Sequence, residues 1–141
     1  MPISSELHPH QRLVRSRLWG VVSDPDLREH ARLLRADPAF DPSHNHLVDL
    51  REVTELRVAR DTIEAVARVS VFARGVRRAV VASSDFHYGM ARMFEIFSDG
   101  TGRTVTVFRD VREAEDWLGL SGLPDPSDTV GGIHTTAGLG G

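Results

Sequence analysis

Two amino acids that often carry chemistry are missing from this chain: it has no cysteine, and all 17 of its basic residues are arginine. Without cysteine there is no disulfide framework, no thiolate nucleophile and no Cys-ligated metal site. Without lysine there is no Schiff-base chemistry and no phosphate-binding loop that depends on a lysine. An arginine-only composition has two interpretations: recognition of carboxylates or phosphates by the guanidinium fork, or the codon bias of a GC-rich genome.

The sequence also lacks long hydrophobic stretches and an excess of positive charge. No apolar run approaches the roughly 20 residues that cross a bilayer, and residues 1–8 have neither the basic start nor the apolar segment of a signal peptide. We therefore expect a cytoplasmic protein without membrane insertion. The formal net charge of −3 gives no reason to expect nucleic-acid binding.

What the sequence does contain is a regular alternation of strand and helix patterns. Short apolar runs predict strands over residues 3–8, 13–22, 47–50, 79–82 and 104–108. Helical spacing and capping residues predict helices that begin after residues 23, 60, 84 and 110 and end before residues 37, 73, 99 and 119.

This alternation predicts a single α/β domain over residues 1–120, with a mostly parallel sheet, an N-terminal antiparallel hairpin and four helices. From residue 121 the chain is rich in Gly and Pro and shows no periodicity, which predicts a flexible Gly-rich tail over residues 121–141.

The most informative segment is the third predicted strand with the polar stretch behind it. An apolar run broken by Asp49 leads through a polar loop into a helix that opens at Asp61, with Glu64 as its capping-box partner. This pattern is typical of a buried parallel strand that ends at a functional loop. Its V-D-L-x-x-V-T-x-L motif resembles the strand and loop of STAS-like domains, the bacterial anti-sigma-factor antagonists. The resemblance spans residues 3–118 and implies a STAS-like fold.

The resemblance also implies a function and a site. In the signalling members, the loop ends in a phosphorylatable Ser or Thr that opens the helix, whereas residues 57–60 here read Arg-Val-Ala-Arg. We therefore expect a divergent, non-catalytic protein-binding module for signalling that is not phospho-switched in the family manner. Its partner would be an anti-sigma kinase or a larger signalling complex. The expected docking loop consists of Asp49, Arg51, Glu52, Thr54, Glu55, Arg57, Asp61 and Thr62.

The third predicted helix supports an alternative of a different class. The STAS-like topology is similar to that of the lipid-binding CRAL-TRIO fold, so a pocket for a small apolar ligand could be lined by Phe72, Phe86, Tyr88, Met90 and Phe94. Gly89 costs roughly 1 kcal/mol relative to Ala inside a helix, which favours close approach of a backbone or ligand there. The candidate cleft or homodimer seam consists of Phe86, Tyr88, Gly89, Met90, Arg92 and Met93.

No constellation of side chains indicates an enzyme, a metal or a cofactor. The H-x-H pairs at residues 8–10 and 44–46 lie in polar turns, without cysteine or an H-E-x-x-H helix to complete a metal site. His46, which immediately precedes the strand, is interpreted as a half-buried packing residue.

Two further polar groups have structural interpretations. The S-S-D-x-H segment at residues 83–87 contains the parts of a catalytic triad, but consecutive residues at a helix start diverge, so we interpret it as a helix cap. Asp49, in a nearly apolar strand, must be exposed at an end or paired, and Arg51, Arg78 and Arg92 are candidate partners.

Overall fold

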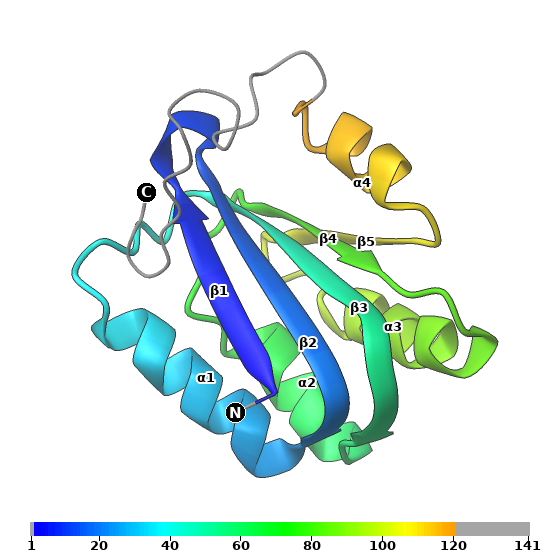
Figure 1. Ribbon diagram of the computed structural model, residues 1–141. Helices are drawn as coiled ribbons and strands as arrows, with labels where there is room; N and C mark the ends of the chain where they lie inside the picture. Colours follow the sequence, from blue (N-terminus) through cyan, green and yellow to red (C-terminus); the bar gives the residue numbers. More distant parts are fainter. Residues whose placement is uncertain (1, 121–141) are drawn as a thin grey trace.

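The computed structural model describes residues 2–120 and folds them into a five-stranded mixed sheet with four α-helices (Figure 1). The predicted α/β architecture is confirmed, and the predicted tail over residues 121–141 lies outside the described residues. The elements are β1 (Ile3–His8), a 3₁₀ turn (Pro9–Gln11), β2 (Leu13–Ser23), α1 (Asp24–Ala36), β3 (Asn45–Arg57), α2 (Arg60–Arg68), β4 (Arg77–Val81), α3 (Asp85–Phe97), β5 (Thr104–Phe108) and α4 (Val111–Trp117).

The strands lie side by side in chain order, β1-β2-β3-β4-β5. β1 pairs antiparallel with β2, and all later pairs are parallel. The hairpin turns through Pro9 and through Arg12, whose left-handed φ of 51° reverses the chain. Each parallel connection passes through a helix, because parallel neighbours cannot be joined by a tight turn.

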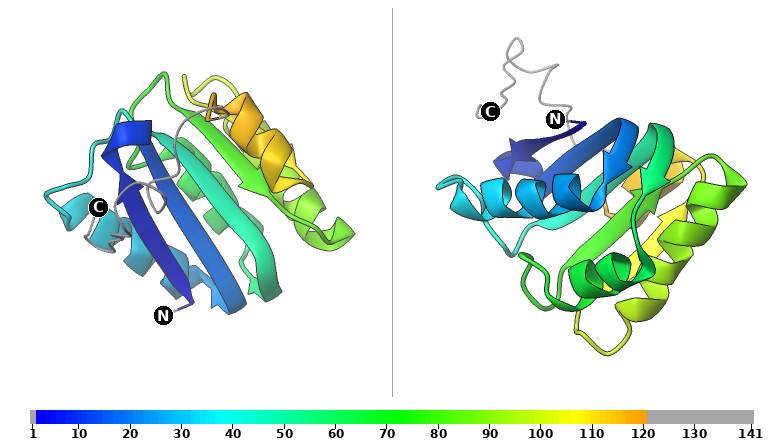
Figure 2. Two further views of the ribbon diagram at one scale, coloured as in Figure 1. Left: turned by 45° about the horizontal axis from the view of Figure 1, so that its top comes forward. Right: turned by 90° about the horizontal axis from the view of Figure 1, so that it is seen from below.

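The two faces of the sheet are covered differently. α1, α2 and α3 lie on one face, which we call the helical face, and α4 covers part of the other over β4 and β5 (Figures 1 and 2). Alternate side chains of a strand point to opposite faces. In β3, Val48 and Leu50 pack with the core of the helical face, whereas Leu47 packs with Ala114 of α4. The described residues leave the α4-side surface of β1 and β2 largely open, and we call it the open face.

β3 differs most from the sequence prediction. It runs for 13 residues, whereas the pattern predicts a four-residue strand and then a loop. Its second half stays in register with the 11-residue β2 through two irregularities, and Val53 and Leu56 belong to the core. The predicted loop conformation is therefore wrong over residues 51–57, which form a strand, whereas the docking role of these residues stays a prediction. Charged side chains on an uncovered sheet face give the same local pattern as a polar turn, because both are exposed to solvent.

The start of α2 also differs from its prediction. The helix begins at Arg60 after Ala59, which has no capping side chain, so the predicted capping box of Asp61 and Glu64 is wrong. Asp24 of α1 accepts a hydrogen bond from the Ala59 N–H at 3.1 Å and fixes this end instead. Glu64 pairs with Arg68, one turn later, at 3.0 Å. A partner distant in the sequence has replaced the local cap.

Candidate functional site

A cavity of about 190 Å³ lies between the helical face of the sheet and α1, α2 and α3. Its wall is almost wholly apolar. The sheet contributes Leu18, Val48, Leu50 and Val80, and the three helices contribute Leu27, Ala31, Leu34, Ile63, Val66, Met90, Ala91 and Phe94. Few polar groups face it, and Arg78 of β4 is the single charged residue among those that line it. A mostly apolar cavity with a few convergent polar groups is the usual form of a small-molecule site.

Arg78 is held by neighbours that carry no negative charge. Its Nε–H donates to His46 Nδ1 at 3.3 Å, and its Nη1 donates to Ser70 Oγ at 3.3 Å. The guanidinium carbon lies 4.9 Å from the ring centroids of both Phe72 and Phe94. No Asp or Glu among residues 2–120 forms an ion pair with it. Burial, with a smaller contribution from the like charge of Arg103, lowers the pKa of Arg78 to about 9, so the group remains cationic at neutral pH.

A chain of hydrogen bonds runs from Arg78 across the sheet. A guanidinium can only donate, so His46 Nδ1 accepts and His46 Nε2 carries the proton. That N–H donates to Ser16 Oγ at 2.8 Å. Ser16 and Ser5 are joined at 2.6 Å, and Ser5 contacts His30 Nε2 of α1 at 2.8 Å. The hydrogen bonds thus connect Arg78 through His46, Ser16 and Ser5 to His30 of α1.

Both histidines of this hydrogen-bond network, His46 and His30, are held neutral. Burial, and then the positive charge of Arg78, lowers the pKa of His46 well below 6.5. Burial also lowers the pKa of His30. His46 is 5% exposed and stacks on Phe72 with 4.4 Å between ring centroids. The prediction that His46 is a half-buried packing residue is right about packing, but it missed the full burial and the hydrogen bonds.

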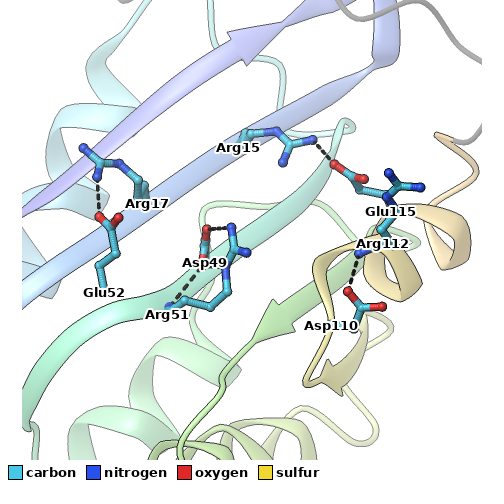
Figure 3. A network of polar contacts seen from close by, with 8 residues as sticks. All are labelled: Arg15, Arg17, Asp49, Arg51, Glu52, Asp110, Arg112 and Glu115. Atoms are coloured by element: carbon cyan, nitrogen blue, oxygen red, sulfur yellow. Dashed lines mark hydrogen bonds and ion pairs between the residues drawn. The ribbon is translucent and has the colours of Figure 1, made fainter.

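The open face carries a second set of arginines, each paired with an acid (Figure 3). Arg15 pairs with Glu115 of α4 at 2.9 Å, and Arg17 pairs with Glu52. Asp49 accepts hydrogen bonds from the backbone N–H of Arg51 and, at 2.8 Å, from its guanidinium. Partial burial favours the protonated Asp49, but the bonds and charge of Arg51 outweigh it and lower the pKa of Asp49. The predicted ion pair of Asp49 is confirmed, with Arg51 as its partner.

The predicted docking residues do not form one site. Asp49, Arg51 and Glu52 gather on the open face (Figure 3), and Glu55 pairs with Arg57 at the exposed end of β3. The other three are Thr54, exposed in β3, and Asp61 and Thr62 in the first turn of α2.

The predicted cleft on α3 is displaced by part of a turn. Met90 lines the cavity, but Phe86 is 69% exposed, because α3 buries His87 and Ala91 instead. Gly89 faces open space, with no atom within 4 Å of an added Cβ among the described residues, so the expected close approach there is wrong within the described chain.

The other residues of this prediction lie outside the cavity. Tyr88 packs against the core and under the guanidinium of Arg109, 4.3 Å from its ring centroid. Arg92 is exposed, Met93 is half-buried, and neither lines the cavity. The homodimer seam stays a prediction.

The helix-cap interpretation of residues 83–87 is confirmed. Ser84 caps α3 by accepting the His87 N–H at 3.1 Å, so the S-S-D-x-H segment is a helix start. No group of three or more His, Asp or Glu residues in the described chain could hold a metal ion. None of its helices has the length and apolarity needed to cross a bilayer.

Sequence reasoning missed the polar residues of the cavity, namely Arg78, His46, Ser16, Ser70 and His30. One signal was available. Arg78 precedes three apolar residues of β4, so it lies inside a buried strand rather than in the turn before it. What the sequence did not reveal is the register, which places Arg78 directly beside His46.

No family model and no curated protein matches the sequence. Among solved structures, the chain is similar to an uncharacterised DUF3478-family protein with a SpoIIAA-like fold from Shewanella loihica PV-4. The TM-score is 0.57 at 21% identity, over 82% of this chain and 93% of the other. SpoIIAA-like is the fold of the STAS domains, so the STAS-like fold implied by the sequence is confirmed at the level of the fold.

Proposed function

We propose that this protein is a non-catalytic binding module whose cavity holds a small, mainly apolar molecule. The proposal rests on the cavity itself. Protein interiors contain few voids larger than a water molecule, and an apolar cavity of about 150 Å³ is already enough to bind benzene. The space here is about 190 Å³ and is lined from one sheet face and three helices.

The cavity has a way in. Val69 lines it and is nevertheless 75% exposed, which marks the stretch after α2 as the place where the cavity reaches the surface. Val71, close behind it, also lines the wall. A ligand would thus enter beside the end of α2.

The polar groups of the cavity support binding rather than catalysis. Ser16 and His46 are 2.8 Å apart, which is the distance expected of a nucleophile and its base. A serine-activating histidine needs a bare nitrogen toward the hydroxyl and a carboxylate behind it. Here His46 turns its N–H toward Ser16 and has the cation Arg78 behind it, which is the opposite polarity. His46 therefore cannot take the proton of Ser16.

The test is occupancy of the cavity by a neutral apolar probe. Isothermal titration calorimetry with 1-octanol should show binding to the wild type. Ala91→Leu, which adds volume inside the cavity, should weaken that binding at least about tenfold, whereas Ala65→Leu on the exposed side of α2 should not. Failure of 1-octanol and of a fatty-acid probe to bind the wild type would contradict the proposal.

A second candidate, docking of a protein partner, rests on the length of β3. β4 pairs with β3 over His46–Asp49 alone, so no described strand lies beside β3 on that side over residues 50–57 (Figure 1). A free strand edge can accept an extended peptide as a further strand. The resemblance to anti-sigma antagonists suggests an anti-sigma kinase as the partner. The charged side chains of Arg51, Glu52 and Glu55 would also discourage unspecific pairing.

This candidate has its own test. The double variant Arg51→Glu/Glu52→Arg should weaken the binding of an anti-sigma kinase from the same organism in surface plasmon resonance. Glu113→Arg on the exposed side of α4 is the control. No phosphate should be transferred, because residues 57–60 contain no hydroxyl. Stoichiometric phosphorylation of Thr54 or Thr62 by mass spectrometry would show a phospho-switch after all.

A further inference from the structure

We propose that the ligand of the cavity is an amphiphilic carboxylate whose anionic group pairs with Arg78, an inference that rests on the proposed function and specifies its chemistry. The geometry points to this class because Arg78 is the one charge among the residues that line an apolar site, and no ion pair with an acid is formed by it among the described residues. Buried charges in proteins are as a rule paired, because an isolated one loses its hydration without compensation.

The Arg78 guanidinium has N–H groups without an acceptor among the described residues. It carries five N–H groups, and the described contacts account for one on Nε and one on Nη1. The two phenylalanine rings attract the cation through their faces, but they offer it no carboxylate-like acceptor. The unused N–H groups form the planar fork that binds carboxylates in pairs of parallel hydrogen bonds.

Ser70 supplies a second donor at the same place. Its Oγ accepts from the Phe72 N–H at 3.0 Å and from Arg78 Nη1 at 3.3 Å, and no described group accepts its own O–H. That proton can complete the cradle of an anion. Ser70 also follows Val69 directly, so Arg78 is held next to the stretch where the cavity reaches the surface.

The site matches one negative charge rather than two. The other cation nearby, Arg103, does not line the cavity, and its two terminal nitrogens donate to the carbonyl oxygens of Phe72, Ala67 and Arg68 at the end of α2. A phosphate monoester carries close to two charges at neutral pH and would remain only half neutralised. A carboxylate is neutralised by Arg78 alone, and its hydrocarbon part would occupy the apolar space among Leu27, Met90 and Phe94.

The test compares head groups on one hydrocarbon chain. At neutral pH, octanoate should bind the full-length wild type about tenfold to hundredfold more tightly than 1-octanol, and octylammonium should bind more weakly than either. Arg78→Met, which keeps the side chain long and apolar, should remove the preference for octanoate. Arg32→Met on the exposed side of α1 should keep it.

Each failure has a separate meaning. Equal affinity for octanoate and 1-octanol would overturn the head-group assignment while the cavity proposal stands. Absence of binding by all three probes would overturn both. Preference for octyl phosphate over octanoate would overturn the carboxylate assignment. Retention of the octanoate preference in Arg78→Met would show that another group holds the anion. The wild-type comparisons decide the head group even if Arg78→Met does not fold.

Discussion

The arginines on the two faces of this sheet differ in one respect. On the open face, Arg15, Arg17 and Arg51 each meet a carboxylate of the same chain. On the helical face, Arg78 meets a histidine, a serine and two aromatic rings, and no acid among the described residues. The first set is neutralised internally and offers little to an incoming anion. The informative feature of this arginine-rich chain is therefore a guanidinium inside a cavity that has no acidic partner among the described residues.

The difference between the two faces is removed most directly by giving Arg78 a carboxylate partner in the same chain. Ser70 Oγ is 3.3 Å from its Nη1, so Ser70→Asp places an acid there. We expect octanoate binding to lose about 3 kcal/mol, roughly 150-fold, because the new carboxylate both occupies the guanidinium and repels the ligand. Calorimetric titration measures the loss. Ser70→Asn, similar in size but neutral, is the control, and octanoate binding by Ser70→Asp at wild-type affinity would contradict the expectation.

Removal of the Arg78 charge should change the stability of the ligand-free protein little. Arg78 is only partly buried, and its desolvation is offset by contacts with two aromatic rings, worth about 2 kcal/mol, and by hydrogen bonds to His46 and Ser70, worth about 1 kcal/mol each. We expect Arg78→Met to change the free energy of unfolding by less than about 1 kcal/mol in urea titrations. Arg103→Met, which removes three hydrogen bonds to carbonyl groups, should lower it. A much less stable Arg78→Met protein would contradict the expectation and show that the fold itself depends on Arg78.

The two neutral histidines of the hydrogen-bond network, His46 and His30, should make the fold sensitive to mild acid. Their pKa values are lowered in the folded state, so the unfolded chain binds more protons below pH 6.5 and stability falls with pH from there. Between pH 6.5 and 5.5 the loss should be about 1 kcal/mol for His46, whose pKa is lowered well below 6.5, and smaller for His30, measured by urea unfolding. His46→Gln, whose amide can accept from Arg78 and donate to Ser16, should remove its share of the loss. An equally steep loss in that variant would exclude His46 as the cause.

The smallest effect is expected on the open face. Arg17 and Glu52 are both more than half exposed, and exposed ion pairs contribute little. Arg17→Met should change the free energy of unfolding by less than about 0.5 kcal/mol and leave octanoate binding unchanged. A large loss in either measurement would mean that the open face is coupled to the cavity, and the contrast between the two faces would disappear.

Much of the fold is readable from local signals, and the failures have a common origin. The predicted bounds of β5 are confirmed, because the D-G-T-G turn and Asp110 delimit it on both sides. β3 is predicted too short, since its exposed charges give no local sign that β2 continues alongside it. The conformation of these residues depends on strands that are distant in the sequence, and hydrophobic periodicity carries no information about such contacts.

The candidate site shows the same limit. Met90 and Phe94 are predicted as pocket residues, because their spacing marks a buried helix face. Arg78 is predicted only as a possible partner of Asp49, and that pairing is wrong. Arg78 is in register with His46 on the helical face, whereas Asp49 lies one position from Val48, on the opposite face. A shift of one residue along a strand moves a side chain to the other face of the sheet. The spacing of residues in the sequence does not show which residue of β4 lies beside which residue of β3.

The order of the strands has a consequence for the way the molecule is assembled. Every strand pairs with the one made just before it, so the sheet can grow one strand at a time during synthesis, which proceeds from the N-terminus. Pairing between near neighbours also keeps loop closure short, which favours rapid folding. The cavity is completed late, because its wall needs β4 and then Met90 and Phe94 of α3. A nascent chain that ends before α3 therefore has most of its sheet but no complete cavity wall, and the ligand can stabilise only a chain in which α3 has been made.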